Sequence, residues 1–402
     1  MPRKKVILAF SGGLDTSYCT TYLTHEKDLE VHTVTVNTGG FSRDEERKLS
    51  ERAKLLGAKS HKNINIEQSY YRDGLRYLIY GNVLRNGTYP LSVSAERVFQ
   101  AMAIAQYAKE MQADCIAHGS TGAGNDQIRF DMVFHILAPE MEILTPVRDQ
   151  KLTREEEISY LKSRGITLDW QQTAYSLNQG LWGTSVGGKE TLRSDLPLPE
   201  EAYPTPVTKK GREELTLHFE QGELVGLNDK RYANPVAAIK ELNALAAPYG
   251  IGRDIHVGDT IIGIKGRVGF EAAAPVLIIK AHQALEKHTL SKWQIYWKDQ
   301  LSEWYGMLMH EGQYLEPVMR DIEVYLQHSQ QTVTGKVFLR LHPYRFEILG
   351  IESPYDLMDA RFASYGEVNR AWSAQDVKGF AKILANQTRI YHAVQQKEEK
   401  AE

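Results

Sequence analysis

A segment of seven residues, Ser11–Ser17 (SGGLDTS), combines glycines, hydroxyl groups and a carboxylate directly after an apolar run. Gly12 and Gly13 allow a sharp turn and a close approach of the backbone to a ligand. If a helix begins here, the N–H groups of its first turn have no backbone partners and, with the nearby hydroxyls, form an anion site of the kind that binds phosphates. The alternative is a plain strand-to-helix turn capped by Asp15 or Thr16.

A second polar segment, residues 118–131 (HGSTGAGNDQIRFD), contains further residues that bind ligands well. Its glycines permit a tight loop, Asn125 and Asp126 offer amide and carboxylate oxygens, and Arg129 offers a guanidinium that pairs with carboxylates. The alternative is a solvated loop in which Asp126 and Arg129 form an incidental charge pair.

Composition and charge exclude several classes of partner. The 402 residues include 48 basic and 51 acidic side chains, a formal charge of −3, so we expect no nucleic-acid partner. The N-terminal residues lead directly into a predicted strand and no apolar run is long enough to span a bilayer, so we expect no membrane association. Cys19 and Cys115 lack a Cys-x-x-Cys spacing, so we expect both to be packing residues of a protein in the reducing cytoplasm. No cluster has metal-ligand spacing, so any metal is expected to arrive with a nucleotide.

The first part of the chain alternates β-rich runs with helical patterns, which is typical of an α/β fold with a parallel sheet and helices on both faces. The expected strands are Val6–Phe10, Val31–Asn37, Lys59–Ile66, Cys115–Gly119 and Glu142–Pro146. The expected helices are Thr16–Glu26, Arg43–Leu56 and Ala95–Gln112. Ligands bind beyond the carboxyl ends of the strands in such a sheet, which is where both polar segments fall.

Changes in pattern predict three parts along the chain. A charged helix with a capping box at Thr153 closes the first part near residue 165. Alternating apolar residues then predict hairpins in an α+β second part. A helical apolar stripe after Ser373 predicts a C-terminal helix that packs on its own domain or on a neighbouring subunit. The predicted parts are residues 1–165, 166–365 and 366–402.

The motif SGGLDTS resembles the pyrophosphate loop of the N-type ATP pyrophosphatases, and it lacks the Gly-Lys-Ser/Thr ending of a P-loop. With residues 118–131 in the right order and at a fitting spacing, the chain resembles the argininosuccinate synthase family over nearly its whole length. The resemblance implies an adenine nucleotide alpha hydrolase-like domain, a synthetase domain that binds substrate, and an oligomerisation helix of a homotetramer. It implies a ligase of arginine biosynthesis that uses ATP and Mg²⁺ to form citrullyl-AMP, and then joins citrulline to aspartate.

The resemblance also assigns roles to residues of this chain. Catalytic roles fall to Asp15, Asp126 and Arg129. The expected ATP-binding residues are Ala9, Phe10, Ser11, Gly12, Gly13, Leu14, Asp15, Thr16, Ser17, Val36 and Gly119. Aspartate is expected at Thr121, Asn125 and Asp126. Citrulline is expected at Tyr89, Ser94, Asn125, Arg129, Ser185 and Ser194. Arg97 is a further ligand candidate, with a solvated helix face as the alternative.

Three positions depart from the family's pattern. Ala123 stands where the family usually has a lysine, so a cation near the phosphates is missing. Gly258 and Phe270 stand where the family usually presents a Glu and a Tyr to citrulline, groups that suit a free α-ammonium. Three interpretations remain open: an enzyme that accepts an N-acyl citrulline, one in which Asp259 or Glu271 takes over for plain citrulline, and a catalytically weak nucleotide-binding homologue.

Overall fold

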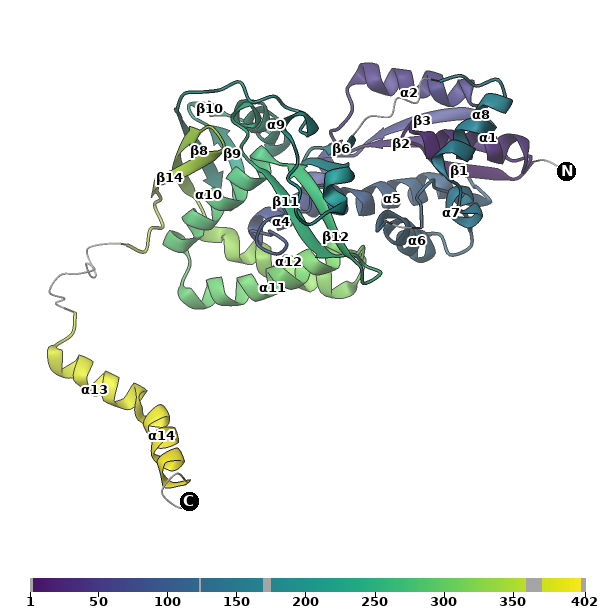
Figure 1. Cartoon of the computed structure of the whole chain (residues 1–402). Helices are drawn as coiled ribbons and strands as arrows, with labels where there is room; N and C mark the ends of the chain where they lie inside the picture. The colour runs from purple at the N-terminus through teal and green to yellow at the C-terminus, as the bar shows by residue number, and fades with distance from the viewer. Residues whose placement is uncertain (1–2, 123, 169–174, 359–370, 399–402) are drawn as a thin grey trace. The chain divides into compact units, whose positions relative to one another are not determined.

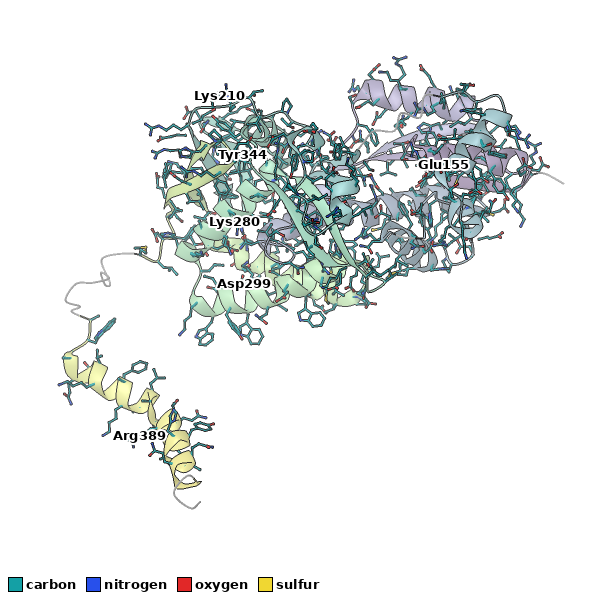
Figure 2. All side chains as sticks on the ribbon, viewed as in Figure 1. Glu155, Lys210, Lys280, Asp299, Tyr344 and Arg389 are labelled. Carbon is teal, nitrogen blue, oxygen red and sulfur yellow. The ribbon has the colours of Figure 1, made fainter. Side chains whose placement is uncertain are left out.

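The computed structural model describes residues 3–122, 124–168, 175–358 and 371–398 (Figure 1). The chain divides into two compact units, residues 1–354 and residues 355–402. Side chains of both signs extend from the surface, among them Glu155, Lys210 and Asp299 (Figure 2). Among the described residues, no helix is long and apolar enough to cross a membrane.

A five-stranded parallel sheet forms the first part of the larger unit, as the alternating pattern predicts. The strand order is β3-β2-β1-β4-β5, and the predicted strand ends differ from the observed ones by one or two residues. Val6, Ile7 and Leu8 of the central strand are fully buried because helices cover both faces. The strands are β1 (Lys5–Ala9), β2 (Glu30–Asn37), β3 (Ser60–Asn65), β4 (Cys115–Ala117) and β5 (Glu142–Leu144).

Helices on the two faces of this sheet position the polar segments. One face is covered by α1 (Leu14–His25), α2 (Arg43–Leu55), α7 (Pro146–Gln150) and α8 (Arg154–Ser163). The other face is covered by α5 (Ser92–Glu110) and α6 (Asp126–Leu137) (Figure 1). The predicted capping box at Thr153 is confirmed, with its hydroxyl accepting from the backbone N–H of Glu156. Cys19 and Cys115 are buried free thiols, as expected.

Two antiparallel sheets follow, which confirms the predicted hairpins. One sheet has the order β11-β12-β7-β6 and the other β10-β9-β8-β13-β14. The first contains β6 (Tyr175–Gly180), β7 (Gly183–Gly188), β11 (Arg253–Asp259) and β12 (Lys265–Glu271). The second contains β8 (Glu213–Glu220), β9 (Glu223–Leu227), β10 (Lys230–Arg231), β13 (Gly335–His342) and β14 (Arg345–Glu352). Helices pack beside them: α9 (Pro235–Ala246), α10 (Ala273–Thr289), α11 (Lys292–His310) and α12 (Pro317–Ser329).

One helical segment of the first part packs into the core of the second. It runs through α3 (Glu67–Tyr70), a π-helix (Tyr71–Leu75) and α4 (Arg76–Tyr80). Its buried side chains belong to the same apolar cluster as α10, α12 and β13. Consequently, the predicted boundary near residue 165 falls within a single compact unit.

The second unit contains the predicted C-terminal helix in two pieces, α13 (Ala374–Leu384) and α14 (Asn386–Glu398). The capping box of Ser373 and Asp376 is confirmed at its start. The predicted helix is interrupted by one residue, Ala385, which separates the two pieces. The apolar stripe is exposed, with Phe380 and Ile383 at 65% and 77% exposure.

Candidate active site

A cleft of about 1070 Å³ lies beyond the carboxyl ends of β1, β2 and β4. Its other walls come from β6, β7 and the β11–β12 hairpin of the neighbouring antiparallel sheet. The β6–β7 turn is joined to the first sheet, because the backbone N–H of Leu181 donates to the carbonyl of Thr38 at 2.9 Å. Both polar segments line this cleft, as predicted from the position of ligands in parallel sheets.

The Ser11–Ser17 segment turns from β1 into α1. Gly12 has a φ of +74°, and a Cβ there would lie 2.3 Å from a methyl carbon of Leu49, so glycine is required. The N-cap of α1 is Gly13, not Asp15 or Thr16, so the first-turn N–H groups are left without a side-chain cap. The hydroxyls of Ser17 and Thr16 both donate to the Gly13 carbonyl, at 2.7 and 3.3 Å, and Ser17 does not line the cleft.

The second polar segment, residues 118–131, begins in close contact with the Ser11–Ser17 turn. A Cβ on Gly119 would lie 3.2 Å from the carbonyl carbon of Asp15 and from the backbone nitrogen of Thr16. A glycine therefore lets the two segments approach closely enough to contact the same ligand. The segment then leads into α6, whose N-cap Asn125 also lines the cleft.

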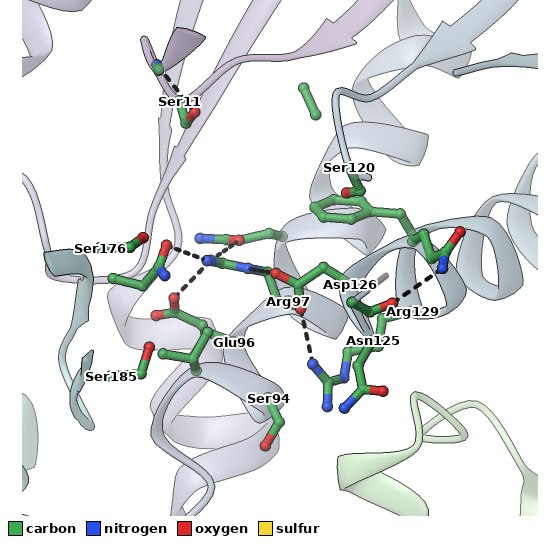
Figure 3. Close-up of a pocket in the computed structure, with 18 of the residues that line it drawn as sticks. Ser11, Ser94, Glu96, Arg97, Ser120, Asn125, Asp126, Arg129, Ser176 and Ser185 are labelled. Atoms are coloured by element: carbon green, nitrogen blue, oxygen red, sulfur yellow. Dashed lines mark hydrogen bonds and ion pairs between the residues drawn. The ribbon is translucent and has the colours of Figure 1, made fainter. Parts of the chain in front are cut away.

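A network centred on Arg97 holds the middle of the cleft together (Figure 3). Its Nε donates to Asp126 at 2.9 Å, and its Nη1 donates to both Glu96 and Gln100, at 2.8 and 2.9 Å. A fourth bond, to the side-chain oxygen of Asn178 at 2.9 Å, reaches across to β6. The prediction of a solvated helix face is wrong here, because the Arg97 side chain is only 14% exposed.

Arg129 contacts the same carboxylate from the other side. It donates to the second oxygen of Asp126 at 2.9 Å and twice to the carbonyl of His310, at 2.9 and 2.8 Å. Burial alone would raise the pKa of Asp126, but the guanidiniums of Arg97 and Arg129 lower it. Burial lowers the pKa of Arg129. Asp126 is therefore a carboxylate at neutral pH and a weak base.

Glu96 is a buried acid of the cleft that the sequence analysis missed. It is 2% exposed, accepts from the Thr38 hydroxyl at 2.8 Å and from Arg97 at 2.8 Å. A Cβ on Gly180 would lie 2.1 Å from its carboxylate oxygen, so the β6–β7 hairpin packs directly over it. Burial raises the pKa of Glu96 to about 7, against the lowering effect of Arg97 and Thr38. Its position one residue before a ligand candidate on a predicted helix was the only signal in the sequence.

Most predicted site residues line the cleft together. Those in the first segment and its surroundings are Ala9, Phe10, Ser11, Gly13, Leu14, Asp15, Thr16, Val36 and Gly119. Those around α5, α6 and the antiparallel sheet are Tyr89, Ser94, Thr121, Asn125, Asp126, Arg129, Ser185 and Gly258.

Four predicted residues do not line the cleft: Gly12, Ser17, Ser194 and Phe270. Ser194 is exposed in the loop after β7 and does not line the cleft, whereas Ser176 of β6 does. Ser176 is the second residue of β6, whereas Ser194 lies beyond the end of the β6–β7 hairpin. Phe270 is 1% exposed and packs behind Tyr89, with ring centroids 5.4 Å apart, so it presents nothing to the cleft. Ala123 lies outside the described residues.

Comparison with known proteins places both halves of the chain in one family. Residues 5–167 match the model of the arginosuccinate synthase N-terminal HUP domain, and residues 175–391 match that of the arginosuccinate synthase C-terminal domain. The chain is 37% identical over 407 residues to the argininosuccinate synthase of Xanthomonas campestris pv. campestris, covering 98% of this chain and 100% of the relative. It is 34% identical over 388 residues to that of Methanocaldococcus jannaschii, covering 96% and 97%.

Proposed function

The chain belongs to the argininosuccinate synthase family, and we propose that the cleft described above is its active site. The enzyme is an ATP-dependent ligase that joins citrulline and aspartate in arginine biosynthesis. The observation that supports this location is the close approach of the two motifs, where Gly119 packs against Asp15 and Thr16. A nucleotide at the first motif and an amino acid at the second would then share one cleft.

The first step activates the ureido group, whose oxygen is a poor leaving group. Its oxygen attacks the α-phosphate of ATP, and the bond between the α- and β-phosphates breaks to release pyrophosphate. We assign the stabilisation of the departing charge to the N–H groups at the start of α1 and to the hydroxyls of Ser11 and Thr16. The result is citrullyl-AMP.

The residues beside the phosphate loop suit a Mg²⁺ ion that arrives with the nucleotide. Burial raises the pKa of Asp15, and burial together with Asp15 raises the pKa of Glu157 to about 8. Glu157 is therefore protonated at neutral pH and does not line the cleft, so Asp15, which does, is the hard oxygen donor that we assign to Mg²⁺. Bound there, Mg²⁺ would supply positive charge to the polyphosphate.

We assign citrulline to Tyr89, Ser94, Asn125, Arg129 and Ser185, and add Ser176 in place of Ser194. The three bonds from Arg129 to Asp126 and His310 fix the orientation of its guanidinium fork, which leaves two of the five N–H donors of an arginine for a ligand. This arrangement suits a carboxylate of the substrate.

We assign aspartate to Thr121, Asn125 and Asp126. The Asn125 side-chain oxygen accepts from the backbone N–H of Ile261 at 2.9 Å, so its amide group can donate to a substrate carboxylate. Asp126 can accept from the substrate ammonium and orient it. Because its lowered pKa makes it a weak base, its role is positioning more than proton removal. The neutral amine then attacks the adenylated carbon and AMP leaves.

The C-terminal helices and the two cysteines bear on the assembly and location of the enzyme. We propose a homotetramer, as the family resemblance implies, in which the apolar stripe of α13 and α14 packs on another subunit. Light scattering on a chain ending before Ser373 tests this, and an unchanged mass would remove the tail from the interface. We place the enzyme in the cytoplasm, where ATP is available and the free thiols of Cys19 and Cys115 are stable.

The direct test incubates the purified chain with ATP, Mg²⁺, aspartate and a citrulline substrate. Release of pyrophosphate together with an adduct of the expected mass supports the proposal. ATP binding without either product would instead support a nucleotide-binding homologue. Asp126→Asn serves as the matched variant at the site, and Asp44→Asn on the exposed surface of α2 serves as its control.

A further inference from the structure

Buried nitrogen atoms without partners lie beside one end of the cleft, at Tyr89, which His256 and His310 line and Arg85 does not. The Tyr89 ring stacks on His256 with centroids 5.1 Å apart, and His256 and His310 are 4% and 7% exposed. In the part of the chain that the structure describes, Nδ1 of each histidine and Nε of Arg85 are buried and have no hydrogen-bond partner. Buried polar atoms of this kind are usually satisfied, so a ligand with hydrogen-bonding oxygens would complete this end.

The electrostatics of this end disfavour a further cation. Burial, assisted by Arg85, lowers the pKa of His256 to about 4, and burial with Arg129 and Arg85 lowers that of His310 to about 2. Asp254 and Asp126 act in the opposite direction on the two histidines, but their effects are smaller. Both imidazoles are therefore neutral at pH 7 and each offers one N–H donor. The surroundings that keep the two imidazoles unprotonated would also disfavour a substrate ammonium beside them.

The imidazole of His256 explains why residue 258 is a glycine. A Cβ at this position would lie 2.5 Å from Nε2 of His256 and 3.4 Å from the side-chain nitrogen of Asn86. Strand β11 therefore presents an imidazole to the cleft here and has no room for an acid at the neighbouring position. The loop before Tyr89 is held against this strand, because Asn86 donates to the carbonyl of Val257 at 3.0 Å.

The two acids that could replace a missing ammonium partner are already paired. Asp259 lines the cleft, but its carboxylate lies 2.7 Å from the ammonium of Lys265. Glu271 is 5% exposed, lies 3.0 Å from the guanidinium of Arg253 and does not line the cleft. Among the described residues, this end therefore offers buried donors, and the acid that lines it, Asp259, is an exposed residue paired with Lys265.

From these contacts we propose that this end of the cleft binds an acyl group on the α-nitrogen of citrulline, and that the enzyme uses an N-acylated citrulline in preference to the free amino acid. The inference rests on the proposed function. Acylation removes the ammonium charge and adds a carbonyl oxygen that accepts from the imidazole N–H groups or Arg85. The chemistry is otherwise unchanged: the ureido oxygen attacks the α-phosphate, pyrophosphate leaves, and the aspartate amine displaces AMP and loses a proton. The product is N-acyl argininosuccinate, with the amide bond intact.

The test compares citrulline, N-acetylcitrulline and N-succinylcitrulline with the full chain, ATP, Mg²⁺ and aspartate. We expect kcat/KM to be about tenfold or more higher for at least one acylated substrate, the effect of one charge-assisted hydrogen bond or an avoided unpaired charge. Equal or better turnover of citrulline overturns the inference and leaves the proposed function intact. Failure of all three substrates overturns both.

Two variants connect the preference to this end of the cleft. Arg85→Gln and His256→Gln should each lower kcat/KM for the preferred acylated substrate about tenfold while changing that for citrulline less than threefold. Arg231→Gln, which removes an exposed surface ion pair with Glu220, is the matched control and should change neither value. Equal losses for acylated and free citrulline in both variants would overturn the assignment of the acyl group to this end.

Discussion

Replacing Arg97 with lysine should weaken the use of aspartate more than the use of the citrulline substrate. Three guanidinium nitrogens of Arg97 make four bonds, to Asp126 on α6, Glu96 and Gln100 on α5, and Asn178 on β6. A lysine has its three N–H donors on one nitrogen, so it keeps the charge but cannot reach partners on all three elements.

The magnitude follows from the bonds that are lost. Loss of one hydrogen bond to a charged partner costs about 1.5–3 kcal/mol, which corresponds to a decrease of about 10- to 100-fold in kcat/KM for aspartate. The decrease should come mainly through KM, because Asp126 is expected to position the substrate ammonium. The effect on the citrulline substrate should be several times smaller, because Arg129 keeps its bonds to His310.

The assay is continuous detection of pyrophosphate with aspartate varied at saturating levels of the other substrates. Arg47→Lys is the control, since Arg47 also bridges two carboxylates, of Asp44 and Glu51, but its side chain is 62% exposed. That variant should be as active as the wild type. If Arg97→Lys unfolds at the wild-type temperature and its kcat/KM for aspartate is within twofold of wild type, the network does not position the substrate and the reasoning is refuted.

Three further predictions test the surroundings of the network. Because burial raises the pKa of Glu96 to about 7, the wild type loses stability as the pH rises from the pKa of the unfolded chain through about 7. Glu96→Gln should therefore gain about 2–3 kcal/mol in free energy of unfolding relative to wild type between pH 5 and 8. Urea titrations that show the same difference at both pH values would contradict this. Gly180→Ala should lower the free energy of unfolding by about 1–3 kcal/mol, because its Cβ would meet Glu96. The control Gly187→Ala, whose Cβ would have its nearest neighbour 4.0 Å away, should change the melting temperature little. Equal melting temperatures for the two variants would argue against close packing over Glu96. Ser176→Ala should lower kcat/KM for the citrulline substrate about fivefold, the effect of one neutral hydrogen bond, while Ser194→Ala should leave it unchanged; the reverse pattern would restore Ser194 to the site.

Local patterns in the sequence predicted the elements that depend on neighbouring residues. The apolar run before Ser11 and the capping box at Thr153 act within one strand or one helical turn, and both elements are present. Helix α4 and the π-helix before it were missed, because Tyr71, Leu75 and Leu78 are buried in a segment with no clear polar face. A helix buried on several sides has no amphipathic period to detect.

The motifs also predicted which segments meet at the cleft, but not which charged side chains it buries. A charged residue near the start of a helix usually faces solvent, but Arg97 is buried, and one of its partners, Asn178, comes from a strand 81 residues later in the chain. Glu96 was missed for the same reason, since Gly180 covers it from the same hairpin. Ser176 was missed likewise, because its place in the cleft depends on where the β6–β7 hairpin begins, which the sequence pattern does not specify.

The position of the helical segment before α5 has a consequence for how the protein is made. Arg76 pairs with Glu223 at 2.7 Å, the carbonyl of Tyr80 accepts from Lys298 at 3.2 Å, and that of Asp73 accepts from Tyr314 at 2.8 Å. These partners leave the ribosome 147, 218 and 241 residues later. The buried face of this segment therefore stays uncovered through most of translation, and we expect the nascent chain to need protection from aggregation until α12 has been synthesised.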